Sequence, residues 1–331
     1  MLDIKILAPA AAFTATLLLL VIFLRTGLFT GIQDIPNQRS LHFHPIPRVG
    51  GLALMIGAFG TYGILFRQPL WCIEIPILLL IAVSFADDVW GLPAILRLLT
   101  HFAAATIFTY WGLGFAPVDM VAILIVIVVV WMINLYNFMD GSDGLAGGMA
   151  MIGFCVYGIA ALLARRSDLA VVSFSIAASA TAFLIYNFHP AKIFLGDVGS
   201  IPLGFAAGSL GLLGWNRSIW PLWFPLLVFS PFIVDATLTL LKRLSHRERV
   251  WEGHREHCYQ RMVRMGWGHS RTALVEYGLM VCVGSSAVIA LRWSPSMQVV
   301  LLVGWAFVYL GIAFSLDRAW RRYQAIQTNA D

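Results

Sequence analysis

Five aspartates stand at the ends of long apolar segments, with few neutralising residues beside them. Ionisable groups at a membrane edge are costly and by default mark a functional site. If the five converge on one face, they repel one another unless a cation lies among them. The pattern therefore predicts a site for a hard divalent cation. The five residues are Asp87, Asp88, Asp140, Asp143 and Asp197.

Two of these aspartates are adjacent and follow the apolar run 70–86. Neighbouring carboxylates raise the pKa of one of the pair, which suits either a metal site or a general base. The structural alternative is an aspartate that caps the next helix, with Gly91 and Pro93 forming the turn. One carboxylate would be enough for a cap, so two in succession favour function.

A second group combines amides with acids. Asn134 and Asn137 lie three residues apart at the end of an apolar segment, so they share a helix face. Asp140 and Asp143 continue this spacing into a glycine-containing turn, and four such groups can bind a nucleotide or a metal. A solvated turn is the alternative. A calcium EF-hand is disfavoured, because Met151 stands where a bidentate glutamate is needed.

Glycines accompany two further polar positions. Those around Asp197 allow backbone and ligand to approach closely, and Phe194 offers a stacking face. A helix cap is the alternative for this aspartate. Upstream, Arg48 precedes Gly50 and Gly51, a pair that permits close backbone packing or phosphate approach at a helix start.

The segment 241–272 is rich in arginine and histidine. One interpretation is a juxtamembrane polybasic stretch attracted to anionic lipid head groups. The interleaved histidines favour a phosphate-binding cap over the acidic site. The basic residues are Lys242, Arg243, His246, Arg247, Arg249, His254, Arg255, His257, Arg261, Arg264, His269 and Arg271.

The composition is that of a membrane protein. Of 331 residues, 60% are hydrophobic and 12% are charged, against about 25% charged in soluble domains. The mean hydropathy is +0.81. The net charge of +5 is therefore interpreted as a topology signal, and no nucleic-acid partner is expected. The four cysteines show no paired spacing, so neither a disulfide nor a cysteine metal site is expected.

The apolar segments predict one all-α integral membrane domain over residues 1–331. A crossing needs roughly 20 apolar residues, which gives about eleven transmembrane helices. A count of about ten is the alternative, because the glycine-rich segment 199–214 is short. The expected spans are 7–24, 49–66, 70–86, 95–112, 119–136, 145–164, 169–187, 199–214, 219–240, 273–291 and 297–316.

The basic residues orient these spans. Of the 22 Lys and Arg residues, 16 fall in one alternating set of connections and 6 in the other. The positive-inside rule makes the richer set cytoplasmic, which puts the N-terminus in the periplasm and the C-terminus in the cytoplasm. All five aspartates fall in this same set. We therefore expect a site that faces the cytoplasm and is capped by the segment 241–272.

These motifs, in this order over about residues 34–272, resemble the polyprenyl-phosphate N-acetylhexosamine-1-phosphate transferases. That superfamily includes the enzymes that start O-antigen, enterobacterial common antigen and teichoic-acid linkage synthesis, and the peptidoglycan translocase MraY. The string Asn-x-x-Asn-x-x-Asp-Gly-x-Asp-Gly-Leu, from Asn134 to Leu145, is the most specific part of the likeness. The loop that begins at His254 is nearest to the O-antigen branch that uses UDP-FucNAc or UDP-QuiNAc.

The resemblance implies a Mg²⁺-dependent phospho-N-acetylhexosamine transferase, with Mn²⁺ as the alternative ion. Such an enzyme transfers HexNAc-1-phosphate from a UDP-N-acetylhexosamine (GlcNAc, FucNAc or QuiNAc type) to undecaprenyl phosphate and releases UMP. It implies a location in the bacterial inner membrane and a role in lipopolysaccharide or related cell-wall glycan synthesis.

Residue roles follow from the same resemblance. Asp87, Asp88 and Asp197 match the catalytic aspartates, and Asp87 is the proposed base or, in an older proposal, the nucleophile. Asp197 and Asp88 match the metal site beside the substrate diphosphate, and Phe194 falls where the family stacks an aromatic ring on uracil. The full set expected to bind substrate is Asn134, Asn137, Asp140, Asp143, Phe194, Arg97, His257, His254, Arg39, Gly50 and Gly51.

The likeness departs from the family in one place. When Gly266-Trp267 is aligned with the family's Gly-aromatic pair, the usual His-x-His-His becomes His257-Cys258-Tyr259-Gln260. Only His257 is therefore carried over, with His254 as a stand-in. Because this loop is thought to affect sugar selectivity, the departure leaves the donor sugar open. The prenyl length and a homodimer are also left open.

A cation- or proton-coupled membrane transporter is the competing function. Transporters place their carboxylates near the midplane, in broken and repeated helices. In this chain the acids lie at loop ends on one predicted side, and the sequence shows no internal repeat. The distribution therefore favours an enzyme.

Overall fold

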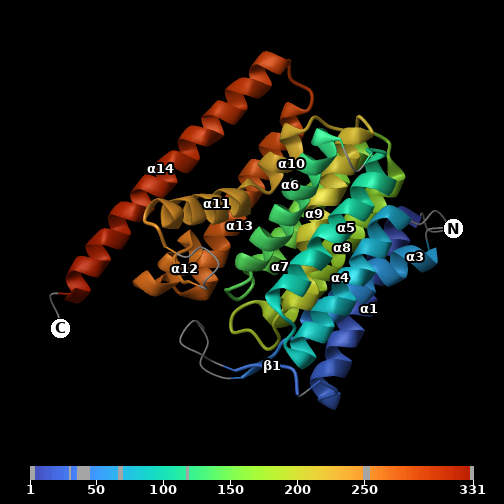
Figure 1. Cartoon of the computed structure of the whole chain (residues 1–331), viewed down its shortest axis with the longest axis horizontal. Helices are drawn as coiled ribbons and strands as arrows, with labels where there is room; N and C mark the ends of the chain where they lie inside the picture. Colours follow the sequence, from blue (N-terminus) through green and yellow to red (C-terminus); the bar gives the residue numbers. More distant parts are fainter. Residues whose placement is uncertain are drawn as a thin grey trace.

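The protein is a bundle of helices (Figure 1). The computed structural model describes residues 4–29, 31–35, 45–65, 70–116, 119–248 and 254–328. The elements in chain order are α1 (Ile4–Thr26), β1 (Gln33–Asp34), β2 (Ile46–Pro47), α2 (Gly50–Met55), the π-helical turn η1 (Ile56–Gly60), α3 (Thr61–Leu65), α4 (Trp71–Trp90), α5 (Ala94–Leu113), α6 (Met120–Phe138), α7 (Leu145–Leu163), α8 (Ser167–Asn187), α9 (Asp197–Asn216), α10 (Trp223–Val228), α11 (Ser230–Ser245), α12 (Cys258–Met262), the π-helical turn η2 (Val263–Trp267), α13 (Gly268–Ala290) and α14 (Pro295–Thr328).

Helix occupies all or most of each range in which a span is expected, so the helical fold is confirmed. Within the described residues, seven helical stretches are long and apolar enough to cross a membrane: α1, α6, α7, α8, α9, α12 with α13, and α14. α4 is not among them, since it carries Glu74 as well as Asp87 and Asp88. The number of spans and the side on which each terminus lies stay predictions.

α9 lies in the middle of the bundle and is almost wholly buried (Figure 1). Its glycines let α6 come close: a Cβ on Gly204 would lie 2.7 Å from the carbonyl oxygen of Met132. Closely packed membrane helices use small residues at such contacts. The glycine content that made 199–214 the least secure span is thus what allows this helix to take the central place.

Two predicted segments differ from the structure. The range 219–240, expected as one span, is divided into α10 and α11, because Pro231 stands in the first turn of α11 and has no N–H to continue a helix. The segment 241–272, expected as a loop, is partly helical: α11 extends to Ser245, and α12 and η2 precede α13. Gly266, with φ 91°, marks the kink before α13.

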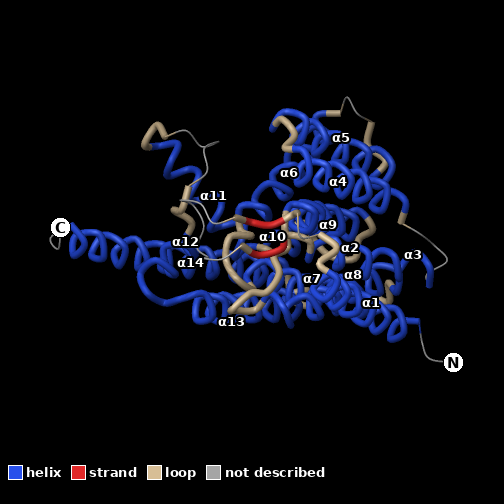
Figure 2. Tube along the Cα trace, turned by 90° about the horizontal axis from the view of Figure 1, so that it is seen from below, coloured by secondary structure: helices blue, strands red, loops and turns tan. Residues whose placement is uncertain are grey.

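The helix ends that carry most of the predicted site gather at one end of the bundle. α4 and α6 end there, whereas α5, α7 and α9 begin there. β1 and β2 pair antiparallel, with Gln33 opposite Pro47, and Figure 2 shows them in red in the middle of this face. Arg48 follows β2 directly, so the short pair brings a basic side chain to the aspartates.

α14 is the most separate element. It runs apart from the main bundle (Figure 1) and is largely exposed. It packs against α13 and, near its C-terminal end, against α12. Its contact with α12 links it to the segment expected to cap the site.

Candidate active site

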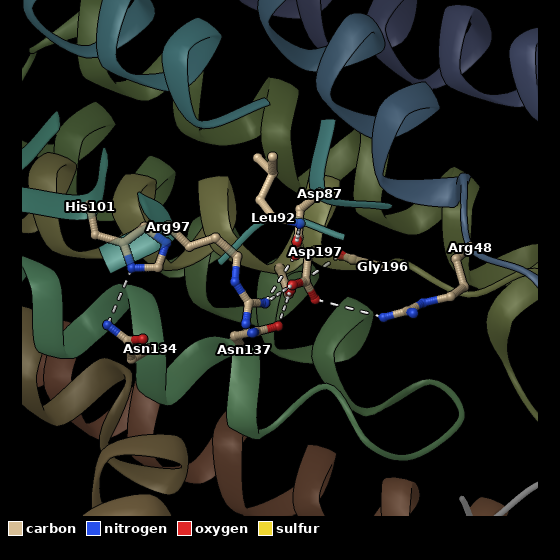
Figure 3. A network of polar contacts seen from close by, with 10 residues as sticks. Arg48, Asp87, Leu92, Arg97, His101, Asn134, Asn137, Gly196 and Asp197 are labelled. Atoms are coloured by element: carbon tan, nitrogen blue, oxygen red, sulfur yellow. Dashed lines mark hydrogen bonds and ion pairs between the residues drawn. The ribbon is translucent and has the colours of Figure 1, made fainter. Parts of the chain in front are cut away.

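Two aspartates and two arginines form a connected cluster (Figure 3). Nη1 of Arg97 donates to Oδ2 of Asp87 at 3.0 Å and lies 3.5 Å from Oδ2 of Asp197. Nη2 of Arg48 lies 3.8 Å from Oδ1 of Asp197. Arg97 therefore bridges two sequence motifs that lie far apart in the chain.

The turn between α4 and α5 fixes Asp87. Gly91 ends α4 in the left-handed region (φ 67°), and its N–H donates to the carbonyl of Asp87 at 2.8 Å. The N–H of Leu92 then donates to Oδ1 of the same aspartate at 2.7 Å. Arg97 stands in the first turn of α5 and faces back toward α4. One carboxylate oxygen of Asp87 thus accepts a hydrogen bond within the turn, and the other accepts a hydrogen bond from Arg97 in the cluster.

Asp88 and Asp140 add to the negative charge. Oδ2 of Asp88 is buried and has no hydrogen-bond partner in the described part of the chain. Burial, together with the charge of Asp197, raises the pKa of Asp140 well above its usual value. If all are ionised, four carboxylates face the two guanidinium groups, an excess of two negative charges.

This donor set fits a hard divalent cation. Protein sites commonly hold Mg²⁺ through one or two carboxylates, and water and substrate phosphates complete the coordination. Among the residues that the structure describes, no group of three His, Cys, Asp or Glu side chains could hold a metal ion by itself. Asp88, with its unpartnered oxygen, and Asp197 are the residues that would hold such an ion.

Asn134 and Asn137 lie one turn apart on α6 and have different partners. Nδ2 of Asn134 donates to the carbonyl of Val130 at 2.7 Å and lies 3.4 Å from Nδ1 of His101 on α5. Oδ1 of Asn137 accepts the hydroxyl of Ser200 at 2.7 Å. Asn137 is therefore beside the first turn of α9, whereas Asn134 faces α5 one turn deeper (Figure 3).

Gly50 and Gly51 act through backbone packing. Their N–H groups donate to the carbonyls of Phe194 and of the residue after it, both at 2.9 Å. A Cβ on Gly51 would overlap the Cα of Gly199 at the start of α9. The N–H groups that a phosphate would need are thus engaged, so of the two alternatives the geometry gives close packing. Arg39, also predicted to bind substrate, lies outside the described residues.

Asp143 belongs to a second polar cluster. Its Oδ2 lies 2.6 Å from Nδ1 of His189 and accepts the N–H of Ala191 at 3.2 Å. Its Oδ1 lies 4.0 Å from Nδ1 of His269, a nitrogen that also bonds the hydroxyl of Ser142 at 2.8 Å. The two imidazole rings are stacked 5.1 Å apart. The five aspartates therefore divide into a set of four and Asp143, which takes imidazole partners instead of the arginines.

Three polar residues of this region were not singled out from the sequence. Oδ1 of Asn187 accepts the N–H of Gly144 at 3.0 Å, and its Nδ2 donates to the carbonyl of Ile193 at 2.9 Å, which joins two site loops. Asn187 and His189 stand at the end of an apolar run just before the Asp197 motif, so position was an available signal. Nothing comparable marks His101, which lies inside the apolar α5.

α12 belongs to the basic segment 241–272 and packs against the loop that carries Asp140. Oη of Tyr259 donates to the carbonyl of Phe138 at 3.1 Å, and a Cβ on Gly141 would overlap this hydroxyl. His257 is 3% exposed, and its ring stacks 6.4 Å from that of Phe138. The segment predicted to cap the site is thus in contact with it.

His254 lies beside His257, with ring centroids 4.8 Å apart. Burial, followed by the neighbouring His257 and Arg243, lowers the pKa of His254 to about 4. Its imidazole is therefore neutral at pH 7. It can form a hydrogen bond with a phosphate, but it brings no positive charge. The arginines of the segment must supply the positive charge.

Comparison with known proteins gives consistent matches. The family described as glycosyl transferase family 4 matches residues 70–214. A probable undecaprenyl-phosphate N-acetylglucosaminyl 1-phosphate transferase of Bacillus subtilis is 30% identical over 310 residues, 87% of each chain. A decaprenyl-phosphate N-acetylglucosaminephosphotransferase of Mycobacterium tuberculosis is 27% identical over 330 residues, 86% of this chain and 81% of the relative. A phospho-N-acetylmuramoyl-pentapeptide-transferase of Moorella thermoacetica is 30% identical over 175 residues, 52% of each chain.

The residues matched by the family include Asp87, Arg97 and Asp197 of the cluster. The apolar helices together with these relatives make the chain a multi-pass membrane protein. The matches give no support to the transporter alternative or to a homodimer. The motifs agree with the match over 87% of the Bacillus subtilis relative: the chain belongs to the polyprenyl-phosphate N-acetylhexosamine-1-phosphate transferases of glycosyl transferase family 4.

Proposed function

We propose that the protein transfers an N-acetylhexosamine 1-phosphate from a UDP-N-acetylhexosamine to undecaprenyl phosphate and releases UMP. The two long relatives are named for N-acetylglucosamine phosphate transfer to polyprenyl phosphates, which supports the lipid acceptor and a GlcNAc-type sugar. UDP-FucNAc and UDP-QuiNAc are the alternative donors. The reaction is proposed to occur at the cytoplasmic face of the inner membrane and to start O-antigen or a related surface glycan.

The observation that carries the proposal is the cluster in which Arg97 joins Asp87 to Asp197. A diphosphate and a phosphate monoester together bring roughly four negative charges to a membrane edge, where repulsion is weakly screened. The excess of carboxylates would strengthen that repulsion. Asp88 and Asp197 would hold a divalent cation, Mg²⁺ or in its place Mn²⁺, which would supply charge compensation to the diphosphate.

The chain's own residues perform the remaining tasks. Asp87 is oriented by Leu92 and Arg97, and we assign to its carboxylate the role of taking a proton from the lipid phosphate. An oxygen of that phosphate forms a bond to the β-phosphorus of the donor, and the bond from this phosphorus to the bridging oxygen breaks, so UMP leaves. Arg97, whose side chain is 36% exposed, has further N–H groups to offer to a phosphate oxygen.

An apolar cavity supports a lipid acceptor. It has a volume of about 200 Å³ and lies between α6, α9 and α10, with Leu124, Val128, Leu212 and Leu226 in its lining. Aliphatic walls of this kind suit an isoprenoid chain, which can pass from the bilayer into the cavity and stay in apolar surroundings. We therefore assign part of the prenyl tail to this cavity.

The test is UMP release by purified protein given undecaprenyl phosphate, Mg²⁺ and a panel of UDP-N-acetylhexosamines. We expect release with at least one donor, loss of activity with chelator, and background rates for Asp197→Asn and Asp87→Asn at unchanged thermal stability. Turnover near that of the wild type in either variant, or no release with any donor, would refute the proposal.

A further inference from the structure

A buried carboxylate outside the aspartate cluster holds the start of α12. Asp235, on α11, is 6% exposed. Its Oδ1 accepts the N–H of Cys258 at 2.8 Å, and its Oδ2 accepts the N–H of Tyr259 at 3.3 Å. The hydroxyl of Thr239 donates to Oδ1 at 3.1 Å. Hydrogen bonds to a buried carboxylate are among the strongest in proteins, so Asp235 fixes α12 to α11.

The same carboxylate faces His257. Nδ1 of this histidine lies 3.5 Å from Oδ1 of Asp235. Within the described residues Nδ1 makes no hydrogen bond, so this contact is a charge lying beside the ring. The ring also stacks with those of Phe138 and Tyr259. The neighbouring rings thus restrict the orientation of the imidazole.

α12 has a second anchor on its other side. Nη1 of Arg261 donates to Oδ1 of Asp317 on α14 at 2.7 Å, and Nζ of Lys242 donates to the same carboxylate at 2.9 Å. The side chain of Asp317 is 32% exposed, against 7% for that of Asp235. Solvent screens the outer ion pairs, so the inner carboxylate is the stronger of the two anchors.

We propose that Asp235 is a positioning residue for the sugar-nucleotide side of the active site. By holding the start of α12, it keeps the ring of His257 in place on the side of the donor diphosphate and keeps the basic segment against the loop of Asp140. Asp235 does not itself touch the substrate. This inference rests on the proposed function, since His257 binds the donor only if the donor is a sugar nucleotide.

Kinetics of Asp235→Asn test this role. The substitution keeps the size and one carbonyl acceptor but removes the charge that faces His257. We expect the KM for the sugar nucleotide to rise at least about tenfold, because a charged hydrogen-bond acceptor is lost. The kcat and the KM for polyprenyl phosphate should change less than about threefold, and Asp235→Glu should recover part of the loss. An equal rise in both KM values would overturn the assignment.

A double variant asks whether Asp235 acts through His257. If it does, Asp235→Asn with His257→Gln will match His257→Gln alone within about twofold, whereas independent effects multiply. The matched control is Asp168→Asn. Asp168 pairs with Arg217 at the far end of α9, about 30 Å from Asp197, so its kinetics should be those of the wild type.

Limited trypsin digestion tests the positioning without any substrate. The side chain of Arg261 in α12 is only 6% exposed, so cleavage after it reports release of this helix. We expect faster cleavage at Arg261 in Asp235→Asn, and wild-type rates in Asp168→Asn. If the wild type releases no UMP, the proposed function fails while the digestion still decides the anchor. An unchanged cleavage rate would refute the positioning role.

Discussion

The aspartate cluster and the α12 region hold their residues in different ways. In the cluster, Arg97 joins carboxylates that stand at the ends of long helices, each inside its own motif. In the α12 region, carboxylates on α11 and α14 hold a helix of only five residues. Long helices keep their ends in place by packing, whereas a short one depends on discrete contacts. The first region is therefore built into the bundle, and the second is attached to it.

The two regions also differ in access. The side chains of Asp87 and Asp197 are 12% and 15% exposed, so both carboxylates can be reached by a ligand. Those of Asp235 and His257 are 7% and 3% exposed. Partly open carboxylates suit reaction chemistry, while the buried carboxylate of Asp235 suits the support of neighbouring residues. Acids of one chain at a membrane edge therefore need not share one task.

The largest expected effect tests the bridge in the first region. Arg97→Ala leaves two carboxylates without their shared partner, and we expect UMP release to fall about hundredfold or more. Arg97→Lys keeps the charge but not the planar fork, so its loss should be smaller. Steady-state UMP assays measure both, with Arg217→Ala at the far end of α9 as the control. Equal activity of Arg97→Ala and Arg217→Ala would show that the bridge is dispensable.

A smaller effect tests how rigidly that region is built. A Cβ on Gly51 would overlap Gly199, so Gly51→Ala should lower the free energy of unfolding by about 1–3 kcal/mol and reduce turnover through displaced Asp197. The matched control is Gly63→Ala, because a Cβ there meets nothing within 4 Å. Thermal unfolding in detergent compares the two. A Gly51→Ala protein as stable as the control would contradict close packing.

The smallest expected effect tests the outer anchor of α12 in the second region. Asp317→Asn removes the outer anchor of α12, and because its ion pairs are partly exposed we expect the donor KM to rise only about twofold to fivefold. High salt should reduce the difference from the wild type. A loss larger than that of Asp235→Asn would reverse the ranking of the two anchors.

Much of the fold and of the cluster could be predicted from local patterns. Apolar runs define the helices because each must satisfy its backbone hydrogen bonds internally. Acids and amides at the ends of those runs gave Asp87, Asp88, Asn137, Asp140 and Asp197. The adjacent Gly50 and Gly51 indicated a close approach either of backbone or of a phosphate, and the structure shows close backbone packing. The family followed from the same motifs.

The partners of these residues could not be predicted in this way. Asp143 continues the three-residue spacing of Asn137 and Asp140, yet its partner is His189. Asp235 lies within α11 with no motif around it, yet it holds the start of α12. Which helix faces which depends on packing between segments distant in the chain, and no local pattern encodes it.

Local patterns of hydrophobicity and charge were enough to specify the helical membrane class and the family, because both properties act along the chain. The residues that we propose to bind a divalent cation and phosphate were also picked out by these patterns. Only the tertiary structure decided which aspartates meet, that Arg97 lies between two of them, and that Asp235 supports His257. The physical reason is distance: ion pairs and hydrogen bonds act over a few ångströms, which only the packed bundle sets.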